Sequence, residues 1–205
     1  MNYSLIRDLV GDDIKSILDI GAHFGLFTIG MKGVYPECKF YMVEANKECE
    51  EELKKIDFAD CKICLLSDEK REVEYFMNKH NLTSTGNSYY REITEHFSDE
   101  NLTSVNVIAE TLDTLFENTQ IDFIKLDTQG SEIDILKGGK KLMQSVKYVL
   151  IECSIEEYNL NAPMIDDVRN YMDEIGFDEF STIESHIING RLTQQDLLFI
   201  NREEE

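Results

Sequence analysis

Short apolar segments alternate with segments of helical spacing along most of this chain, and no other feature of the sequence restricts the fold as strongly. Strands are predicted at Ser16–Ile20, Lys39–Val43, Lys62–Leu66, Ile121–Leu126, Val146–Ile151, Phe177–Ile183 and Leu197–Ile200. Helices are predicted at Phe24–Lys32, Lys47–Ile56, Ser131–Met143 and Ile165–Ile175. Continuously apolar strands must be covered on both sides, so the pattern predicts a parallel sheet with helices on both faces, a doubly wound α/β fold.

A single domain is the simplest organisation for these 205 residues, which include only two prolines and no linker rich in glycine or serine. Residues 1–15 are predicted to form a helical extension, and residues 67–118 an insertion between the third and fourth core strands. The insertion contains predicted strands at Val73–Met77 and Ser104–Ala109, a polar stretch at Asn78–Tyr90 and a short helix near Arg91–His96. It serves either as a substrate lid or as an extra hairpin on the sheet edge, and both interpretations stay open.

The chain is strongly acidic, with 41 Asp and Glu against 20 Lys and Arg and a formal net charge of −21. Such a chain repels phosphate backbones and anionic membrane surfaces, so a neutral or cationic small molecule is the expected partner and nucleic acid is not. An alternative is that the acidity only maintains solubility. The N-terminus does not resemble a signal peptide, and no stretch approaches the ~20 apolar residues of a membrane span. We therefore expect a cytoplasmic protein.

Cysteine usage gives no support for a metal or disulfide framework. The chain has five cysteines, and the pair Cys61 and Cys64 has C-x-x-C spacing. This pair lies in a predicted strand, and neither a second pair nor histidines at ligand spacing follow it. We interpret the cysteines as small buried or half-buried residues and predict no metal ligands.

The strongest local signal is a buried strand that runs into a glycine turn and then a helix. Its cofactor-contact candidates are Asp19, Gly21, Ala22, His23, Phe24 and Gly25. Glycine allows a ligand to approach the backbone closely. The spacing is G-x-x-x-G, unlike the G-x-G-x-x-G of dinucleotide binders or a phosphate-binding loop. An acid at the end of the strand suits a ligand with a positive amine better than a pyrophosphate.

Polar residues also follow the second and third predicted strands. Glu44 ends the second strand, 19 positions after Gly25, with Ala45 next to it. An acid at this place can accept hydrogen bonds from both ribose hydroxyls, which predicts an adenosine ligand without separating its possible kinds. Ser67 and Asp68 follow the third strand and are candidates for the adenine edge, although Ser and Asp also favour ordinary turns.

Three acids are candidates for catalysis. Asp127, which is also a candidate for contact with the cofactor, follows the fourth core strand, Glu132 opens the next helix, and Glu152 ends the following strand. Glu132 also has a structural explanation, because acids favour helix N-termini. The polar stretch supplies two substrate-contact candidates, Asn87 and Ser88. Clustered carboxylates can also hold Mg²⁺, but no spacing in the sequence requires it.

The string from Lys125 to Glu132 (Lys-Leu-Asp-Thr-Gln-Gly-Ser-Glu), followed by Leu136-Lys-Gly-Gly139, resembles the signature of the FkbM family of methyltransferases. Further family motifs occur in the family's order at Asp19-Ile-Gly-Ala, Val43-Glu-Ala-Asn, Leu66-Ser-Asp, Glu110-Thr-Leu-Asp and Ile151-Glu. The resemblance covers nearly the whole chain, from about residue 16 to about residue 200. Ala45 departs from it where the family often has proline, and His23 where many members have another polar residue.

This resemblance implies a Rossmann-like class I methyltransferase fold, with a seven-stranded sheet whose last strand is antiparallel. It implies S-adenosylmethionine as the methyl donor and a hydroxyl group of a sugar or other small molecule as the acceptor. On this basis we expect Asp19 at the amino acid part of the cofactor, Glu44 at its ribose and Asp68 near adenine. Asp127, Glu132 and Glu152 are then candidates for the general base, a role that contributes about 10²–10⁴-fold to a rate.

Two other functions are considered. A nicotinamide-dependent oxidoreductase would need the dinucleotide glycine pattern, which the sequence lacks. An inactive Rossmann-like module that binds a partner protein is disfavoured by the nearly complete set of polar residues at the strand ends. The sequence does not predict an oligomeric state or identify the acceptor.

Overall fold

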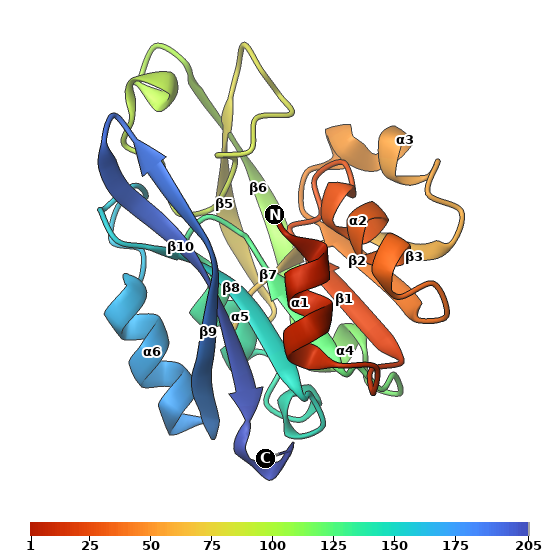
Figure 1. Ribbon diagram of the computed structural model, residues 1–205. Coiled ribbons are helices and arrows are strands. Elements are labelled where there is room, and N and C mark those ends of the chain that lie inside the picture. The colour runs from red at the N-terminus through yellow and green to blue at the C-terminus, as the bar shows by residue number, and fades with distance from the viewer. Residues whose placement is uncertain (205) are drawn as a thin grey trace.

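A computed structural model describes residues 1–204 and shows a seven-stranded sheet between two layers of helices (Figure 1). In spatial order the strands are β3 (Ala59–Ile63), β2 (Lys39–Glu44), β1 (Ser16–Ile20), β7 (Phe123–Leu126), β8 (Tyr148–Ser154), β10 (Arg191–Asn201) and β9 (Phe177–Ile188). The pairs between β3 and β8 are parallel, and β10 is antiparallel to both of its neighbours. This confirms the predicted sheet with an antiparallel last strand.

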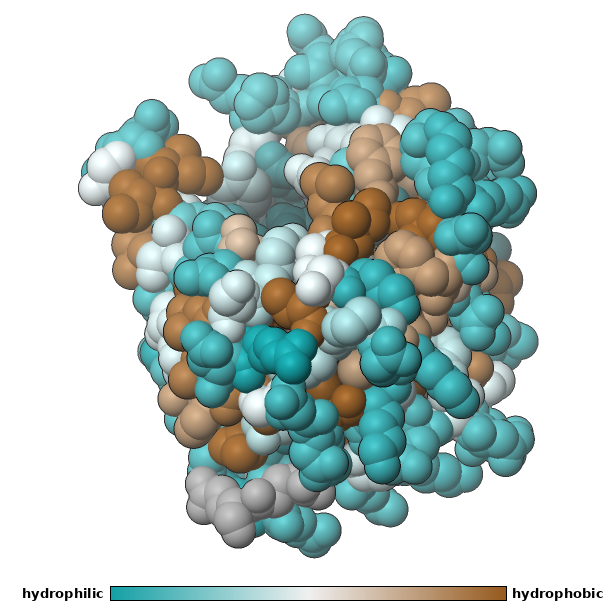
Figure 2. Space-filling model, turned by 45° about the vertical axis from the view of Figure 1, so that its right-hand side comes forward, coloured by the Kyte–Doolittle hydropathy of each residue, from teal (hydrophilic) through white to brown (hydrophobic). Residues whose placement is uncertain are grey.

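Helices cover both faces of the sheet, as predicted. The α-helices are α1 (Tyr3–Val10), α2 (Leu26–Val34), α3 (Glu50–Leu53), α4 (Leu112–Leu115), α5 (Glu132–Lys137) and α6 (Ile165–Glu174). Single 3₁₀ turns form η1 (Lys47–Cys49), η2 (Glu95–Phe97), η3 (Leu142–Gln144) and η4 (Arg202–Glu204). Within residues 1–204, no helix is both long and apolar enough to cross a membrane. On the face drawn in Figure 2, hydrophilic side chains predominate and hydrophobic ones lie in small groups.

The apolar character of β1 follows from its place between the two helix layers. Neighbouring residues of a strand point to opposite faces of its sheet. Ile17 packs in one cluster with Ile6 of α1 and Phe27 of α2, whereas Leu18 packs in another with Leu136 of α5. Burial of each such side chain contributes about 1.5–3 kcal/mol. A strand in this position is therefore mostly apolar on both of its faces.

The third predicted strand, Lys62–Leu66, is wrong as a single element. The structure ends β3 at Ile63 and begins a separate strand, β4 (Leu65–Leu66). β4 pairs with β6 (Leu102–Glu110), which pairs with β5 (Arg71–Asn78), so the three form a second small sheet. The insertion therefore builds its own sheet on β4 and does not add a hairpin to the edge of the main sheet.

Several other boundaries differ from the predicted ones. The helix predicted at Ser131–Met143 is divided into α5 and η3, because the chain turns at Gly138, where any side chain would collide with the carbonyl oxygen of Ser67. The helix predicted near Arg91–His96 is only the turn η2. In contrast, β9 and β10 extend well beyond their apolar parts and meet in a hairpin turn at Asn189 and Gly190, both with positive φ. Asn-Gly is favoured in such turns.

Candidate active site

A cavity of about 90 Å³ lies at the carboxyl ends of β1, β2 and β7. The predicted site residues that line it are Gly21, His23, Glu44, Ala45, Asn87, Ser88 and Asp127. The predicted residues that do not line it are Asp19, Ala22, Phe24, Gly25, Ser67, Asp68, Glu132 and Glu152. The strand ends thus converge on one cavity, as expected for a doubly wound sheet.

The glycine turn after β1 brings two strand ends into contact. Gly21 has φ +76°, and a side chain there would collide with the carbonyl oxygen of Asp127. Glycine at this position therefore allows β1 and β7 to end side by side at the cavity. Ala22 and Phe24 pack in an apolar cluster with Leu53 of α3, and they do not contact the cavity.

Glu44 is held rigidly at the edge of the cavity. Its Oε2 accepts a hydrogen bond from the backbone N–H of His23 at 2.7 Å, and its Oε1 accepts one from the backbone N–H of Asn46 at 2.8 Å. Burial raises the pKa of Glu44, while these two backbone donors oppose that rise. Each carboxylate oxygen retains capacity to accept a further hydrogen bond. The carboxylate is therefore oriented before any ligand arrives.

The polar stretch 78–90 covers the cavity, which favours the interpretation of the insertion as a lid. His23 Nε2 lies 2.8 Å from the carbonyl oxygen of Thr83, and Asn46 Nδ2 donates to that of Leu82 at 2.6 Å. On the opposite side, Ser88 Oγ donates to the carbonyl oxygen of Thr128 at 3.2 Å. Side chains that follow β1 and β2, and a backbone carbonyl of the loop after β7, thus contact one covering segment.

Ser67 and Asp68 lie behind the cavity wall. Ser67 Oγ donates to Asp68 Oδ1 at 3.0 Å and accepts from Arg71 Nη2 at 3.0 Å. The cavity wall in this region is instead apolar and aromatic, with Leu66 and Tyr89 facing inward. The prediction of direct contacts from Ser67 and Asp68 thus differs from the geometry of this structure, because the two residues pair with each other and with Arg71.

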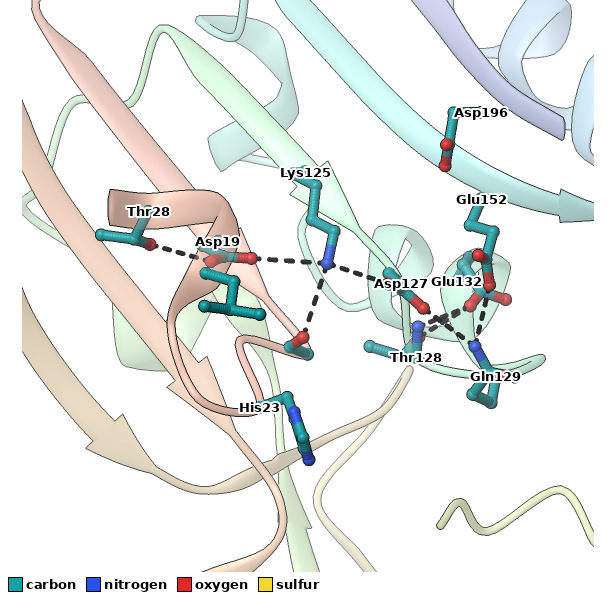
Figure 3. Close-up of polar contacts among 12 residues, drawn as sticks. Asp19, His23, Thr28, Lys125, Asp127, Thr128, Gln129, Glu132, Glu152 and Asp196 are labelled. Carbon is teal, nitrogen blue, oxygen red and sulfur yellow. Dashed lines mark hydrogen bonds and ion pairs between the residues drawn. The ribbon is translucent and has the colours of Figure 1, made fainter. Parts of the chain in front are cut away.

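A buried lysine connects two of the predicted acids (Figure 3). Lys125 Nζ lies 3.6 Å from Asp19 Oδ1 and 3.1 Å from Asp127 Oδ2. Asp19 is fully buried and also accepts a hydrogen bond from Thr28 Oγ1 at 2.8 Å. Burial raises the pKa of Asp19, and the lysine opposes that rise. Asp19 therefore positions Lys125 and does not reach the cavity itself.

Asp127 and Glu152 lie close together and ionise differently. Gln129 Nε2 donates to Asp127 Oδ1 at 2.9 Å and to Glu152 Oε2 at 2.8 Å. Burial opposes ionisation of Asp127, but the Lys125 ammonium and the hydrogen bonds to this carboxylate together outweigh it, so the pKa of Asp127 is lowered. Burial and the charge of Asp127 raise the pKa of Glu152 to about 9. Of these two acids, Asp127 is thus the one that ionises more readily.

Glu132 supports the loop after β7. Its Oε1 accepts hydrogen bonds from the backbone N–H of Thr128 at 2.8 Å and from Thr128 Oγ1 at 3.1 Å. Its Oε2 accepts from the backbone N–H of Gly130 at 3.0 Å. A carboxylate with this many internal donors, turned away from the cavity, orients the loop that presents Asp127 and Gln129.

Glu132→Gln is therefore expected to destabilise the fold more than it impairs catalysis. The amide would place an N–H group against the Gly130 donor, and an unsatisfied buried donor costs about 1–3 kcal/mol. Urea unfolding measures this loss, and kcat at saturating cofactor measures the catalytic effect. A loss of activity as large as that of an Asp127 variant, with unchanged stability, would show instead that Glu132 acts in the reaction.

Sequence reasoning missed three residues that shape the site: Asn46, Lys125 and Gln129. Lys125 stands within an apolar run. Its spacing of two positions from Asp127 was the only indication that the two side chains share one face of the strand. Gln129 has φ +57°, a conformation rare for residues other than glycine, which aims its amide between two acids. Asn46 contacts Leu82, 36 positions away, a distance that no local pattern reveals.

Comparison with known proteins supports the resemblance seen in the sequence. A family model described as the methyltransferase FkbM domain matches residues 19–179. No match is found among curated proteins. The structure of a methyltransferase FkbM from Methylobacillus flagellatus superposes with a TM-score of 0.59 at 17% identity. That superposition covers 92% of this chain but only 44% of the Methylobacillus chain.

Other class I enzymes share the fold. A putative tRNA methyltransferase from Streptococcus pneumoniae superposes with a TM-score of 0.57 at 13% identity, over 97% of this chain and 68% of its own. TrmK from M. capricolum, solved with S-adenosylhomocysteine, gives a TM-score of 0.53 at 12% identity, over 97% and 67%. At these identities the solved structures establish only the fold, and the family model establishes family membership. The chain belongs to the FkbM family of S-adenosylmethionine-dependent methyltransferases.

Proposed function

We propose that this enzyme methylates a hydroxyl group of a sugar or another small molecule. The observation that carries the proposal is the place of the Asp127 carboxyl group, which lines the same cavity as Glu44 and whose pKa is lowered. A carboxylate at this place can accept the hydrogen bond of an acceptor hydroxyl and then its proton. When bound, S-adenosylmethionine supplies an activated methyl group on a sulfonium cation, which acidic surroundings favour.

The residues around the cavity fit this cofactor in chemical character. Glu44 offers acceptors to the two ribose hydroxyls, and the side chains of Leu66, Tyr89 and Ile135 offer an apolar surface to adenine. The cavity of about 90 Å³ is smaller than the ~300 Å³ at the low end of ligand pockets. The polar stretch 78–90 therefore has to move outward to admit the cofactor, and it can close again over both substrates.

We do not expect the acceptor to be a nucleic acid, even though solved enzymes of the same fold include a putative tRNA methyltransferase. The net charge of −21 repels a polyanion, and phosphate contacts supply most of the affinity of nucleic-acid binding. A neutral or cationic small molecule avoids this repulsion. The same charge suits a cytoplasmic enzyme that does not bind anionic membranes. The proposal does not require Mg²⁺.

The acceptor class is tested by methyl transfer from radiolabelled S-adenosylmethionine to a panel of monosaccharides, amino sugars and hydroxylated ring compounds. Mass spectrometry of the product should locate the methyl group on oxygen. A product methylated on nitrogen or carbon, with no ether formed, would contradict the proposal. Transfer to tRNA in preference to every small molecule would contradict it as well.

Glu44→Gln is expected to weaken binding of S-adenosylhomocysteine by about 10- to 100-fold. A hydrogen bond to a charged group contributes about 1.5–3 kcal/mol, and the amide keeps the shape of the side chain while losing its charge. Isothermal titration calorimetry measures the dissociation constant. Glu48→Gln is the matched control, because Glu48 is exposed in the adjacent turn. Equal weakening by both substitutions would show that Glu44 does not hold the ribose.

A further inference from the structure

Three side chains from three neighbouring strands converge beside the cavity, on the side where Glu152 lies. They are Glu152 of β8, His186 of β9 and Asp196 of β10. His186 Nε2 lies 3.0 Å from Asp196 Oδ2 and 3.9 Å from Glu152 Oε1. One ligand atom of each residue lies within 4.8 Å of those of the other two. Since all three stand on paired strands of one sheet, their arrangement is fixed by the fold.

In the part of the chain that the structure describes, the cluster brings two acids together without a lysine or arginine beside them. Asp196 and Glu152 are direct partners in the antiparallel pair of β8 and β10, so their carboxylates repel each other when both are ionised. Asp196 is only 4% exposed. Within residues 1–204 neither acid forms an ion pair with lysine or arginine, and the nearby Lys125 is already shared between Asp19 and Asp127. A cation placed between the two acids would remove this repulsion.

Groups outside the cluster already orient one of its carboxylates. Glu152 Oε2 accepts hydrogen bonds from Gln129 Nε2 at 2.8 Å and from Gln194 Nε2 at 2.9 Å. Its Oε1 is the oxygen that faces His186. Outer hydrogen bonds of this kind commonly orient carboxylates that bind metals. The His186 side chain is 35% exposed, which gives an ion a path from solvent and leaves room for a further ligand.

We infer that Glu152, His186 and Asp196 bind one divalent transition-metal ion of the Zn²⁺ type. An imidazole nitrogen with two carboxylate oxygens suits Zn²⁺ better than Mg²⁺, which prefers oxygen ligands alone. Three protein ligands leave a coordination position open to water or to an oxygen of the acceptor. This site is not the predicted group of Asp127, Glu132 and Glu152. Glu152 belongs to both groups, whereas Glu132 contacts the loop backbone.

Direct binding of Zn²⁺ tests the site without relying on methyl transfer. The full chain, freed of metal by a chelator and dialysed, is titrated with Zn²⁺ and separately with Mg²⁺ by isothermal titration calorimetry. We expect one equivalent of Zn²⁺ to bind and Mg²⁺ to bind far more weakly. Gln194→Ala should weaken Zn²⁺ binding by about 10- to 100-fold, the range for loss of an outer hydrogen bond to a metal ligand. His186→Ala should weaken it further.

His80→Ala is the matched control, because His80 is exposed and distant in sequence from the cluster. Circular dichroism checks that each variant is folded. If His186→Ala fails to fold, the visible spectrum of Co²⁺ bound to the unaltered chain and to Asp196→Asn provides a second measurement. The inference is overturned if no Zn²⁺ binds, or if the variants bind it as tightly as the unaltered chain. Binding of S-adenosylhomocysteine, measured separately, shows whether the proposed function stands independently.

Discussion

Asp127→Asn is expected to lower kcat by about 10²–10⁴-fold, the range that a general base contributes. Asp127 lines the cavity, and Lys125 keeps its carboxylate ionised. The amide preserves the size of the side chain and can still accept one hydrogen bond, but it cannot take a proton from the acceptor hydroxyl. Initial rates with a small-molecule acceptor measure the effect, once methyl transfer to that acceptor has been detected.

Two controls separate a role in catalysis from a general effect of charge or of cofactor binding. Asp57→Asn changes an exposed acid by the same chemistry and should leave kcat unchanged. Binding of S-adenosylhomocysteine to Asp127→Asn should change much less than kcat, because the proposed role concerns the acceptor. Near-normal turnover of Asp127→Asn would remove it as the base. A large loss of cofactor affinity with kcat retained would place it at the cofactor instead.

The sequence predicted the main sheet well because its strands are apolar on both faces. β1 pairs with β7 over Ile17–Ile20, and each strand has helices packed on both of its faces. Neither strand therefore alternates apolar with polar residues, and the sequence identifies both as buried strands. The long β9 and β10 were underestimated for the opposite reason. β9 lies at the sheet edge and buries only Phe177 and Ile183 among its 12 residues, so its polar half looks like a loop.

The site was predicted in part for a related reason. Backbone topology places Glu44 and Asp127 at neighbouring strand ends, and a sequence reveals topology through periodicity. It does not reveal which way a side chain turns after the strand has ended. Glu132 turns toward backbone donors and Ser67 toward Arg71, and in both cases the competing partners lie within four positions. Local hydrogen bonds of this kind are common for short polar side chains.

Local sequence patterns could not predict the contacts between distant segments. His23 and Thr83 are 60 positions apart, and Ser88 and Thr128 are 40 positions apart. Such contacts depend on how the insertion packs against the rest of the chain. The same holds for Glu152, His186 and Asp196, whose proximity requires the register of the terminal hairpin.

Lys125→Met is expected to lower the free energy of unfolding by about 3–5 kcal/mol, the range for removal of one partner from a buried ion pair. The Lys125 side chain is 8% exposed, and the strand register places it opposite Asp19. Methionine fills much of the same volume and can pack on Phe27, over whose ring the lysine ammonium lies at 5.7 Å. The lower free energy of unfolding would therefore come from the carboxylates left without a positive partner. Urea unfolding at pH 7 measures it.

The pH dependence identifies which charge is responsible. Burial raises the pKa of Asp19 above its ordinary 3.8, and Lys125 opposes that rise, so removal of the lysine raises this pKa further. A carboxyl group whose pKa is higher in the folded state stabilises the fold at low pH, and that contribution disappears as the pH rises through the folded pKa. The deficit of Lys125→Met relative to the unaltered chain should thus be smaller at pH 5 than at pH 8.

A second substitution separates the ion pair from simple packing. In Asp19→Asn with Lys125→Met the buried charge of Asp19 is absent, so this double variant should be more stable than Lys125→Met alone. Lys55→Met, which alters an exposed lysine of the turn after α3, should unfold like the unaltered chain. If the double variant were as unstable as the single one at every pH, the loss would come from packing around Lys125. The chain Asp19–Lys125–Asp127 would then have no electrostatic part in holding Asp127 at the cavity.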